Sequence, residues 1–339
     1  YNNEFWKSGH CNIQILYTGY TGSNRVWIHD NTFNEIYANA GVRLDDVSGS
    51  LIENNVFTSD GTQGDHAIYI SYKNDADTNC QDNEVRFNRI YNVREYGILF
   101  CARVDGGAVV LSETTGNHIH HNLIYNSVGD GNAGGVCIYG IDGAVIEYNT
   151  IADGDGDGIS TRQYYGSTSS GGFTVYAENN IISGMNTYST RGYGINNYEN
   201  AKHTIISKYN CLYDNQLGNY NNVDSGTGDA ANGKYYLNST GLTWNGTGWE
   251  SMSTLSPCID AADPADSYEN EPYVNGGRAN MGRWGNTQYA SNSGWGFDTS
   301  HIYVGTKFTA YTDSAHEWNY GTPPENAQDI TDVFDVVLT

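Results

Sequence analysis

The chain repeats a short segment with an asparagine two residues before an apolar residue, and this repeat constrains the fold more than any other feature. The segments read VWIHDNTF, LIENNVF, EVRFNRI, HIHHNLI, VIEYNTI, YAENNII and SKYNCL. Their asparagines are Asn31, Asn55, Asn88, Asn122, Asn149, Asn180 and Asn210. A second set alternates with the first between residues 26 and 212, at spacings of 23 to 38 residues, and reads GVRLDD, AIYISY, GILFCA, GVCIYG, GISTRQ and GINNYE.

Each segment has the alternating pattern of a short strand, so one segment of each set predicts one coil of a solenoid. No coil can bury its apolar face alone, and stacking of coils about 4.8 Å apart creates a continuous core. An asparagine at one position per coil has a physical reason. It tolerates the left-handed turn conformation, and its amide can bond the asparagine of the next coil. The sequence therefore predicts an all-β parallel β-helix.

As a repeat pattern, residues 10–215 resemble the right-handed parallel β-helix proteins of the pectate-lyase-like superfamily, including NosD-like repeat proteins. Residues 255–287, which begin LSPCIDAADPADSYENE, resemble the closing segment of many secreted bacterial and archaeal β-helix proteins. The resemblance implies a right-handed β-helix, extracellular or on the cell surface, of a kind that often acts on polysaccharide. We expect β-helix coils over 1–215, the last coils and the closing segment over 216–290, and a strand-like extension or linker over 291–339.

Composition limits the partners and the location. Asp and Glu number 39 against 16 Lys and Arg, a formal net charge of −23. This charge argues against nucleic acid, because phosphate binding needs a basic surface, and it leaves carboxylates for Ca²⁺. The six cysteines form no Cys-x-x-Cys pair, and their even number fits disulfides in a secreted protein. No apolar run approaches the roughly 18 residues needed for membrane insertion.

Three histidines, His118, His120 and His121, are close enough in sequence to suggest a metal site. Alignment of the asparagine-bearing segments places His120 between Arg86 and Glu147, in a column of polar side chains one coil apart. His121 falls in an aromatic column at a turn. Zinc needs three or four convergent ligands, and the pattern supplies at most two on one face. We expect these histidines to be structural.

The second set of segments presents the better surface for chemistry. With one apolar residue of each strand pointing inward, alternation places two columns of side chains outward. The first column is Arg43, Tyr69, Leu99, Cys137, Ser160 and Asn196. The second is Asp45, Ser71, Cys101, Tyr139, Arg162 and Tyr198. Lys73 and Arg103 follow on successive coils, so this face gathers a large share of the few cations.

Such a face fits β-elimination on an acidic, uronate-containing polysaccharide. The C5 proton of the sugar is weakly acidic, so a lyase must neutralise the carboxylate and supply a base and an acid. By position, the pair Lys73 and Arg103 resembles the base and acid of the alginate-lyase and chondroitinase B family. We expect Lys73 as base, Arg103 as acid or carboxylate clamp, and Tyr139 nearby. Substrate contacts are expected from Arg43, Tyr69, Arg162, Tyr198 and His66.

Two acidic stretches stand just before outward strands, at coil corners. Asp65 and His66 lie in GDHAIYIS, and Asp153, Asp155 and Asp157 lie in ADGDGDGIS. Aspartates at such corners could serve as the acid and base of a hydrolase, which is the second enzymatic interpretation. Alternating Gly and Asp is also ordinary turn chemistry and suits a Ca²⁺ loop. We therefore name the three aspartates as the candidate metal ligands, with Ca²⁺ as the candidate cofactor.

A non-catalytic structural or adhesive surface protein is the alternative. No amphipathic helix precedes CNIQILYTGY, so the first coil would expose open strand edges, and copies could assemble end to end. In this alternative, the cations beside the second-set strands are paired to carboxylates in a mixed ladder. Cations without such partners, next to a tyrosine, would favour the lyase instead. Pure glycan binding would use the same face without a base.

Overall fold

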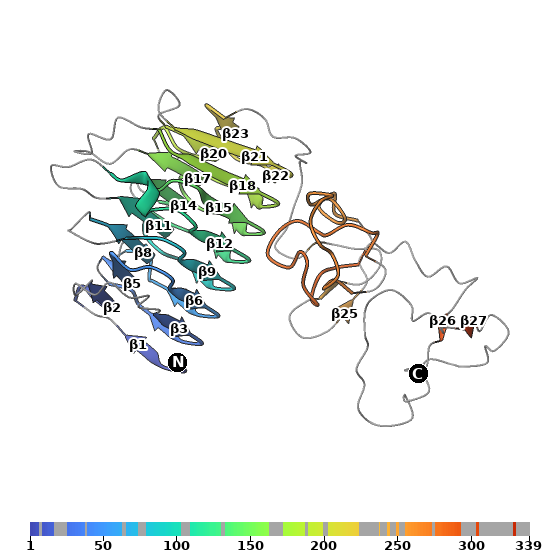
Figure 1. Cartoon of the computed structure of the whole chain (residues 1–339), viewed down its shortest axis with the longest axis horizontal. Coiled ribbons are helices and arrows are strands. Elements are labelled where there is room, and N and C mark those ends of the chain that lie inside the picture. Colours follow the sequence, from blue (N-terminus) through green and yellow to red (C-terminus); the bar gives the residue numbers. More distant parts are fainter. Residues whose placement is uncertain are drawn as a thin grey trace. The chain divides into compact units, whose positions relative to one another are not determined.

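The protein is described by a computed structural model that defines residues 1–6, 9–16, 26–37, 39–62, 66–73, 79–102, 109–129, 133–162, 172–186, 189–198, 203–223, 237, 243–244, 249–250, 255–272, 275–292, 303–304 and 328–329. Contacts divide the chain into two compact units. Unit 1 is Tyr1–Tyr235 with Met281–Arg283, and unit 2 is Tyr236–Asn280 with Trp284–Thr339. Unit 1 is a parallel β-helix, which confirms the predicted fold class (Figure 1).

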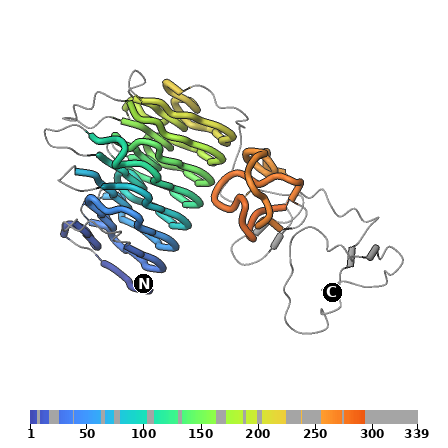
Figure 2. The backbone as a smooth tube through the Cα atoms, in the orientation of Figure 1, coloured from blue at the N-terminus to red at the C-terminus, as the bar shows by residue number. Residues whose placement is uncertain are grey.

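Three parallel sheets run along the β-helix, and the stacked coils are visible in Figure 2. Sheet A consists of β1 (Glu4–Trp6), β4 (Thr32–Asn34), β7 (Val56–Thr58), β10 (Arg89–Tyr91), β13 (Leu123–Tyr125), β16 (Thr150–Ala152), β19 (Ile181–Ser183) and β22 (Cys211–Tyr213). Sheet B consists of β2 (Cys11–Leu16), β5 (Ala40–Asp45), β8 (His66–Tyr72), β11 (Tyr96–Ala102), β14 (Gly134–Tyr139), β17 (Asp157–Arg162), β20 (Tyr193–Asn197) and β23 (Gly218–Asn221).

Sheet C consists of β3 (Trp27–His29), β6 (Leu51–Glu53), β9 (Glu84–Arg86), β12 (His118–His120), β15 (Ala144–Glu147), β18 (Thr174–Glu178) and β21 (Thr204–Lys208). Within the described ranges the helical content is a single 3-10 turn, η1 (Leu111–Glu113). None of the helical structure described is long and apolar enough to cross a membrane.

The core lies inside the three sheets and is built from ladders of like side chains. Along sheet A, the rings of Phe5, Phe33 and Phe57 stack with centroids 4.8 and 4.5 Å apart. Isoleucines continue this ladder on β10, β13, β16 and β19, and Leu212 ends it on β22. Along sheet B, the inward residues expected from the sequence are all fully buried: Val42, Ile68, Ile98, Val136, Ile159 and Ile195. Stacking of the coils thus buries apolar side chains that a single coil would leave exposed.

Each asparagine-bearing segment is two strands with a corner between them, rather than the single strand expected. The asparagine lies between a strand of sheet C and a strand of sheet A, as Asn88 lies between β9 and β10. Its amide bonds the next coil, as predicted. Asn88 donates from its backbone N and from Nδ2 to Oδ1 of Asn122, at 3.0 Å in both cases. This asparagine ladder runs from Asn3 to Asn210.

The left-handed conformation belongs to the residue before each ladder asparagine, which corrects the expectation that the asparagine itself adopts it. Phe87, His121 and Tyr148 have φ of 54°, 56° and 51°, respectively. The ladder asparagine is not among the residues with positive φ, and its amide reaches backbone carbonyls of other coils. Asn122 Nδ2, for example, donates to Val85 O at 2.8 Å.

Unit 2 is held by side chain to backbone hydrogen bonds more than by strands. Its short strands pair as β24 (Thr243–Trp244) with β25 (Trp249–Glu250), and β26 (Tyr303–Val304) with β27 (Gln328–Asp329). Glu271 is buried, and its Oε1 accepts the backbone N of Asn280 and of Asn286, each at 2.7 Å. Burial raises the pKa of Glu271 to about 8. The domain boundaries expected near residues 215 and 290 stay predictions.

Candidate functional site

The outer face of sheet B carries the two columns expected from the sequence. The strand register pairs Arg43 with Tyr69 and Asp45 with Ser71 on β5 and β8. On β14 and β17 it pairs Cys137 with Ser160 and Tyr139 with Arg162. Most of these positions are buried instead of solvated, since Cys137 and Ser160 are fully inaccessible and Asp45 is 1% exposed, whereas Tyr139 and Arg162 are half-buried. The face therefore offers desolvated polar groups, in which electrostatic interactions are stronger than in water.

At one end of this face, Asp45 collects three donors. Arg43 Nε lies 2.9 Å from Asp45 Oδ1, Lys73 Nζ lies 2.8 Å from Oδ2, and the Ser71 hydroxyl donates to Oδ1. Burial alone would raise the pKa of Asp45, but the hydrogen bonds from Lys73, Ser71 and Arg43 lower it below its usual value. The carboxylate is thus ionised and satisfied, and it holds both cations in place.

The predicted base, Lys73, has the carboxylate partner expected of the structural alternative. It also lies two strands away from Tyr139 along sheet B, because Ser71 pairs with Cys101 and Cys101 pairs with Tyr139. At about 4.8 Å per strand, the two positions are on the order of 10 Å apart. The structure therefore does not bring Lys73 and Tyr139 together. The predicted acid, Arg103, and the acid Asp65 lie outside the described residues.

The predicted substrate contacts His66 and Tyr69 are buried next to Arg43. The Arg43 guanidinium lies 4.9 Å from the centroid of the Tyr69 ring, and the His66 ring lies 5.4 Å from it. His66 Nε2 lies 3.4 Å from Glu95 Oε2. Burial, with the charge of Arg43 adding to it, lowers the pKa of His66 to about 3. His66 is therefore neutral at physiological pH.

At the other end of the face, Arg162 is surrounded by tyrosines. Its guanidinium lies 3.9 Å from the centroid of the Tyr198 ring, and Tyr139 is its partner in the strand register. The Tyr139 ring packs edge-on to Tyr96 at 6.5 Å. Burial raises the pKa of Tyr139, and the charge of Arg162 acts against that increase. No carboxylate is paired with Arg162 in the described structure, in contrast to Arg43 and Lys73.

Sequence reasoning missed Tyr96, because strict alternation places it on the same face as Ile98. In the structure, Ile98 belongs to the core, whereas Tyr96 packs with the outward residues Tyr69 and Leu99. The alternation breaks at Gly97, where an added Cβ would lie 2.6 Å from a core methyl of Ile124. A glycine at the start of a strand was the available signal, since such glycines often mark a bend or a close approach of side chains.

Asp157, one of the three aspartates proposed as Ca²⁺ ligands, accepts four hydrogen bonds from the protein. Its Oδ1 accepts the backbone N of Gly192 at 3.0 Å and that of Tyr193 at 3.1 Å. Its Oδ2 accepts Asn196 Nδ2 at 3.0 Å and the Tyr198 hydroxyl at 2.7 Å. The four bonds occupy the lone-pair positions that a cation would need.

The other two aspartates, Asp153 and Asp155, shape the coil corner through their backbone conformation and backbone pairing. Asp153 is left-handed with φ of 51°, and Asp155 forms an isolated bridge with Asn186. Among the described residues, no three His, Cys, Asp or Glu form a group that could hold a metal ion. Ca²⁺ binding at Asp153, Asp155 and Asp157 stays a prediction, because these three side chains do not form a group of ligands in the structure.

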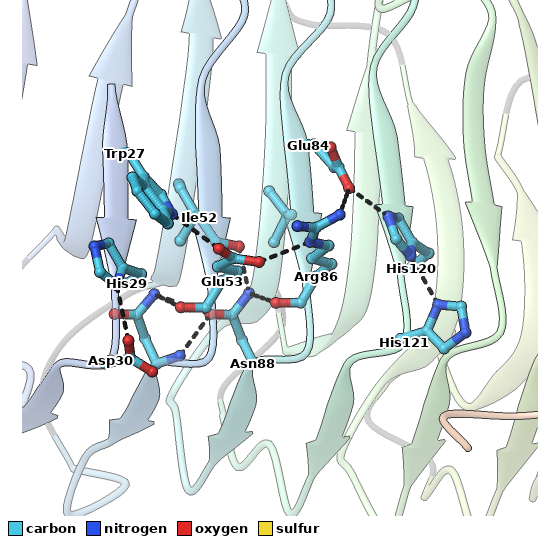
Figure 3. Close-up of polar contacts among 12 residues, drawn as sticks. Trp27, His29, Asp30, Ile52, Glu53, Glu84, Arg86, Asn88, His120 and His121 are labelled. Carbon is cyan, nitrogen blue, oxygen red and sulfur yellow. Dashed lines mark hydrogen bonds and ion pairs between the residues drawn. The ribbon is translucent and has the colours of Figure 1, made fainter. Parts of the chain in front are cut away.

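The histidines of sheet C belong to a chain of polar contacts on its outer face (Figure 3). Arg86 bonds Glu53 at 2.8 Å and Glu84 at 2.7 Å. Glu84 also lies 2.9 Å from His120 Nε2, and His120 Nδ1 lies 2.7 Å from His121 Nδ1. Burial, followed by the charges of His118 and His121, lowers the pKa of His120 to about 2.

The expected columns of these histidines are confirmed. His120 pairs with Arg86 on one side and Glu147 on the other. The His121 ring lies between the rings of Phe87 and Tyr148, tilted against the first and stacked on the second, with centroids 5.0 and 5.1 Å away. The contacts of these side chains join neighbouring coils, which is the structural role expected of them.

A model of a family described as disaggregatase related matches residues 80–262, more than half of the chain. The chain belongs to this disaggregatase-related family. A search of curated proteins found no match, and neither did a search of solved structures. The disaggregatase-related region contains the Arg162 end of sheet B, with Tyr96, Tyr139 and Tyr198, whereas Asp45 and Lys73 precede it.

Proposed function

We propose that this disaggregatase-related β-helix acts on an acidic polysaccharide, by β-elimination next to a uronate residue. The observation that carries the proposal is the cluster of Arg162 and three tyrosines on the desolvated outer face of sheet B. Arg162 supplies a positive charge without a carboxylate partner in the described structure, and Tyr139 is the phenol beside it. The family relation to disaggregatase is consistent with a polysaccharide as substrate.

The proposed chemistry needs a charge partner for the sugar carboxylate and a proton donor for the leaving group. A base removes the C5 proton, its electrons form the C4–C5 double bond, and the C4–O4 bond breaks. Arg162 would stabilise the negative charge that spreads onto the carboxylate. Tyr139, whose pKa burial raises, would be protonated at neutral pH and would donate its proton to O4. Lys73 stays the base predicted from the sequence, but it is paired with Asp45 and lies two strands from Tyr139, so it would have to leave Asp45 and move towards Tyr139 to act on the same sugar.

The first test is the ultraviolet absorbance of the unsaturated product, measured with a panel of polyuronates with Ca²⁺ and with chelator. Replacing Tyr139 by Phe removes the proton donor and leaves the ring, so we expect kcat to fall on the order of 100-fold. Tyr125→Phe, a change on sheet A, is the matched control. Lys73→Ala tests the predicted base in the same assay. No product from any polyuronate would contradict the proposal.

The second candidate is a non-catalytic structural or adhesive protein, and the pairing of Arg43 and Lys73 with Asp45 favours it. In this case the outer face of sheet B is a stabilising network, and copies of the chain associate end to end. Size-exclusion chromatography with light scattering separates the two functions. Large assemblies of a protein that releases no product would support the structural function.

We infer an extracytoplasmic location, either extracellular or on the cell surface. Cys211 and Cys258 are disulfide-bonded, and disulfides persist in oxidising compartments outside the cytoplasm. The formal net charge of −23 disfavours nucleic acid as a partner and agrees with a strongly solvated surface. An acidic polysaccharide would then be recognised through local cations, not through the overall charge.

A further inference from the structure

Within the described part of the chain, one edge of the Arg162 guanidinium has no hydrogen-bond acceptor. Its Nε and Nη2 are both buried, and neither makes a hydrogen bond. Tyr96 Oη and Ser160 Oγ are also buried, in side chains that are 2% exposed and fully inaccessible, and both hydroxyls lie beside the Cys137 thiol. Buried polar groups are nearly always paired in proteins, so the two unpaired nitrogens of Arg162 need an explanation.

These groups lie in a patch on the outer side of sheet B, and Tyr96, although opposite Asp157 in the register, is close enough to act electrostatically on Arg162. Ser160 and Arg162 are alternate residues of β17 and therefore point to the same side. Tyr96 on β11 pairs with Gly134 on β14, whose missing side chain leaves room for the ring. A Cβ on Gly134 would lie 3.2 Å from Cδ1 and Cε1 of Tyr96. The Tyr96 ring thus lies over β14, the strand between its own and that of Arg162.

No described acid neutralises the patch. Asp157, the acid on β17, is occupied by four other donors, among them the Tyr198 hydroxyl. The groups that act electrostatically on Arg162 are Tyr96, Cys137, Tyr139 and Tyr198. Burial raises the pKa of each of them, so all four are neutral at pH 7. The patch therefore carries the positive charge of Arg162, with that of Arg191 nearby, since the Arg191 guanidinium lies 5.8 Å from the centroid of the Tyr198 ring.

We propose that Arg162 Nε and Nη2, with Tyr96 Oη and Ser160 Oγ, form a subsite that binds the free carboxylate of a hexuronate residue. A planar carboxylate matches two parallel N–H donors of a guanidinium edge, and each hydroxyl can donate a further bond. A methyl ester has no negative charge, so it loses the charge-assisted part of this recognition. The subsite rests on the proposed function for the sugar that carries the carboxylate, but the anion binding can be tested separately.

The test is calorimetric titration of the full chain with a uronate tetrasaccharide and with its methyl-esterified form. We expect the wild type to bind the free acid at least tenfold more tightly than the ester. Arg162→Gln should bind both forms alike, and Arg162→Lys should retain part of the preference, since it keeps the charge and loses the bidentate geometry. Arg89→Gln, a change of an exposed arginine on sheet A, should leave the preference unchanged.

Thermal unfolding distinguishes a binding role from a structural one. Burial of Nε and Nη2 without hydrogen-bond acceptors offsets the contact of the Arg162 guanidinium with the Tyr198 ring, so ligand-free Arg162→Met should melt close to the wild type. It should also lose the rise in melting temperature that the tetrasaccharide causes in the wild type. A clearly lower melting temperature of ligand-free Arg162→Met would overturn the subsite, because it would show that Arg162 supports the fold.

The two proposals fail in different ways. If Arg162→Gln keeps the preference for the free acid, the subsite is refuted, while product formation from polyuronates would still support the proposed function. If no polyuronate yields product but the acid preference is present and depends on Arg162, elimination is refuted and the subsite stands.

Discussion

At each corner between sheets C and A, one asparagine amide satisfies the backbone of its own coil and of its neighbours. Asn122 is fully buried, and its Nδ2 donates to Val85 O, His120 O and Asn149 Oδ1. Its Oδ1 accepts two donors from Asn88. The amide thus replaces water for groups that the corner leaves without strand partners.

Asn122→Ala should therefore destabilise the β-helix by about 3 kcal/mol, because it leaves several buried backbone groups unpaired. Asn34→Ala is the matched control. Asn34 lies on sheet A and makes one exposed hydrogen bond to Glu4, so its loss should change stability by less than about 0.5 kcal/mol. Urea unfolding followed by circular dichroism measures both values. Equal losses for the two variants would show that the ladder is not the source of stability.

The buried His66 should make stability depend on pH. Its pKa falls from an ordinary 6.5 to about 3 in the folded state, chiefly through burial, and its Nδ1 has no hydrogen-bond partner. Between these values the unfolded chain binds a proton that the folded protein does not. The contribution of His66 is therefore complete above pH 6.5 and declines as the pH falls towards 3.

Urea unfolding at pH 7, 6, 5 and 4 measures this dependence for the wild type and for His66→Gln. The variant should lose less stability per pH unit, by up to about 1.4 kcal/mol, since one titrating group is removed. Only the slopes are compared, because the substitution also changes packing. Parallel curves for the two proteins would mean that His66 does not control the acid sensitivity.

At the scale of the strand, glycines set the close contact between sheets B and A. An added Cβ would lie 2.5 Å from Ile151 Cγ2 at Gly135, and 2.3 Å from Ile182 Cγ2 at Gly158. Gly135→Ala should destabilise the fold by about 2–3 kcal/mol through overpacking. Gly9→Ala is the control, since a Cβ there meets nothing within 4 Å. Thermal melts of the two variants test the difference, and a neutral Gly135→Ala would contradict the close contact.

A glycine in a similar position, Gly97, explains which part of the candidate site the sequence could predict. The outward columns through Arg43, Tyr139 and Arg162 followed from alternation, and the strand register confirms them. Tyr96 was not predictable by that rule, because the alternation breaks at Gly97. A break of this kind depends on contact with a side chain of another sheet, which lies far away in the sequence.

At the scale of the whole molecule, the cysteines fall into two classes. Cys211 and Cys258 are disulfide-bonded, whereas Cys11, Cys80, Cys101 and Cys137 are thiols. The double variant Cys211→Ser/Cys258→Ser should unfold at lower urea concentration, with a loss of about 2–4 kcal/mol, because the unfolded chain gains conformational freedom. Reductant should weaken the wild type by the same amount and leave the double variant unchanged. A wild type insensitive to reductant would contradict this.

The parallel β-helix followed from the sequence alone, because a strand pattern repeated at each coil can bury its apolar residues only by stacking. The asparagine ladder followed for the same reason. Only the tertiary structure decided which cations are neutralised: Lys73 meets Asp45, and Arg162 meets tyrosines. Those partners come from other coils, and the loops between coils vary in length. Ion pairing is therefore a property of the stacked register and not of the local sequence.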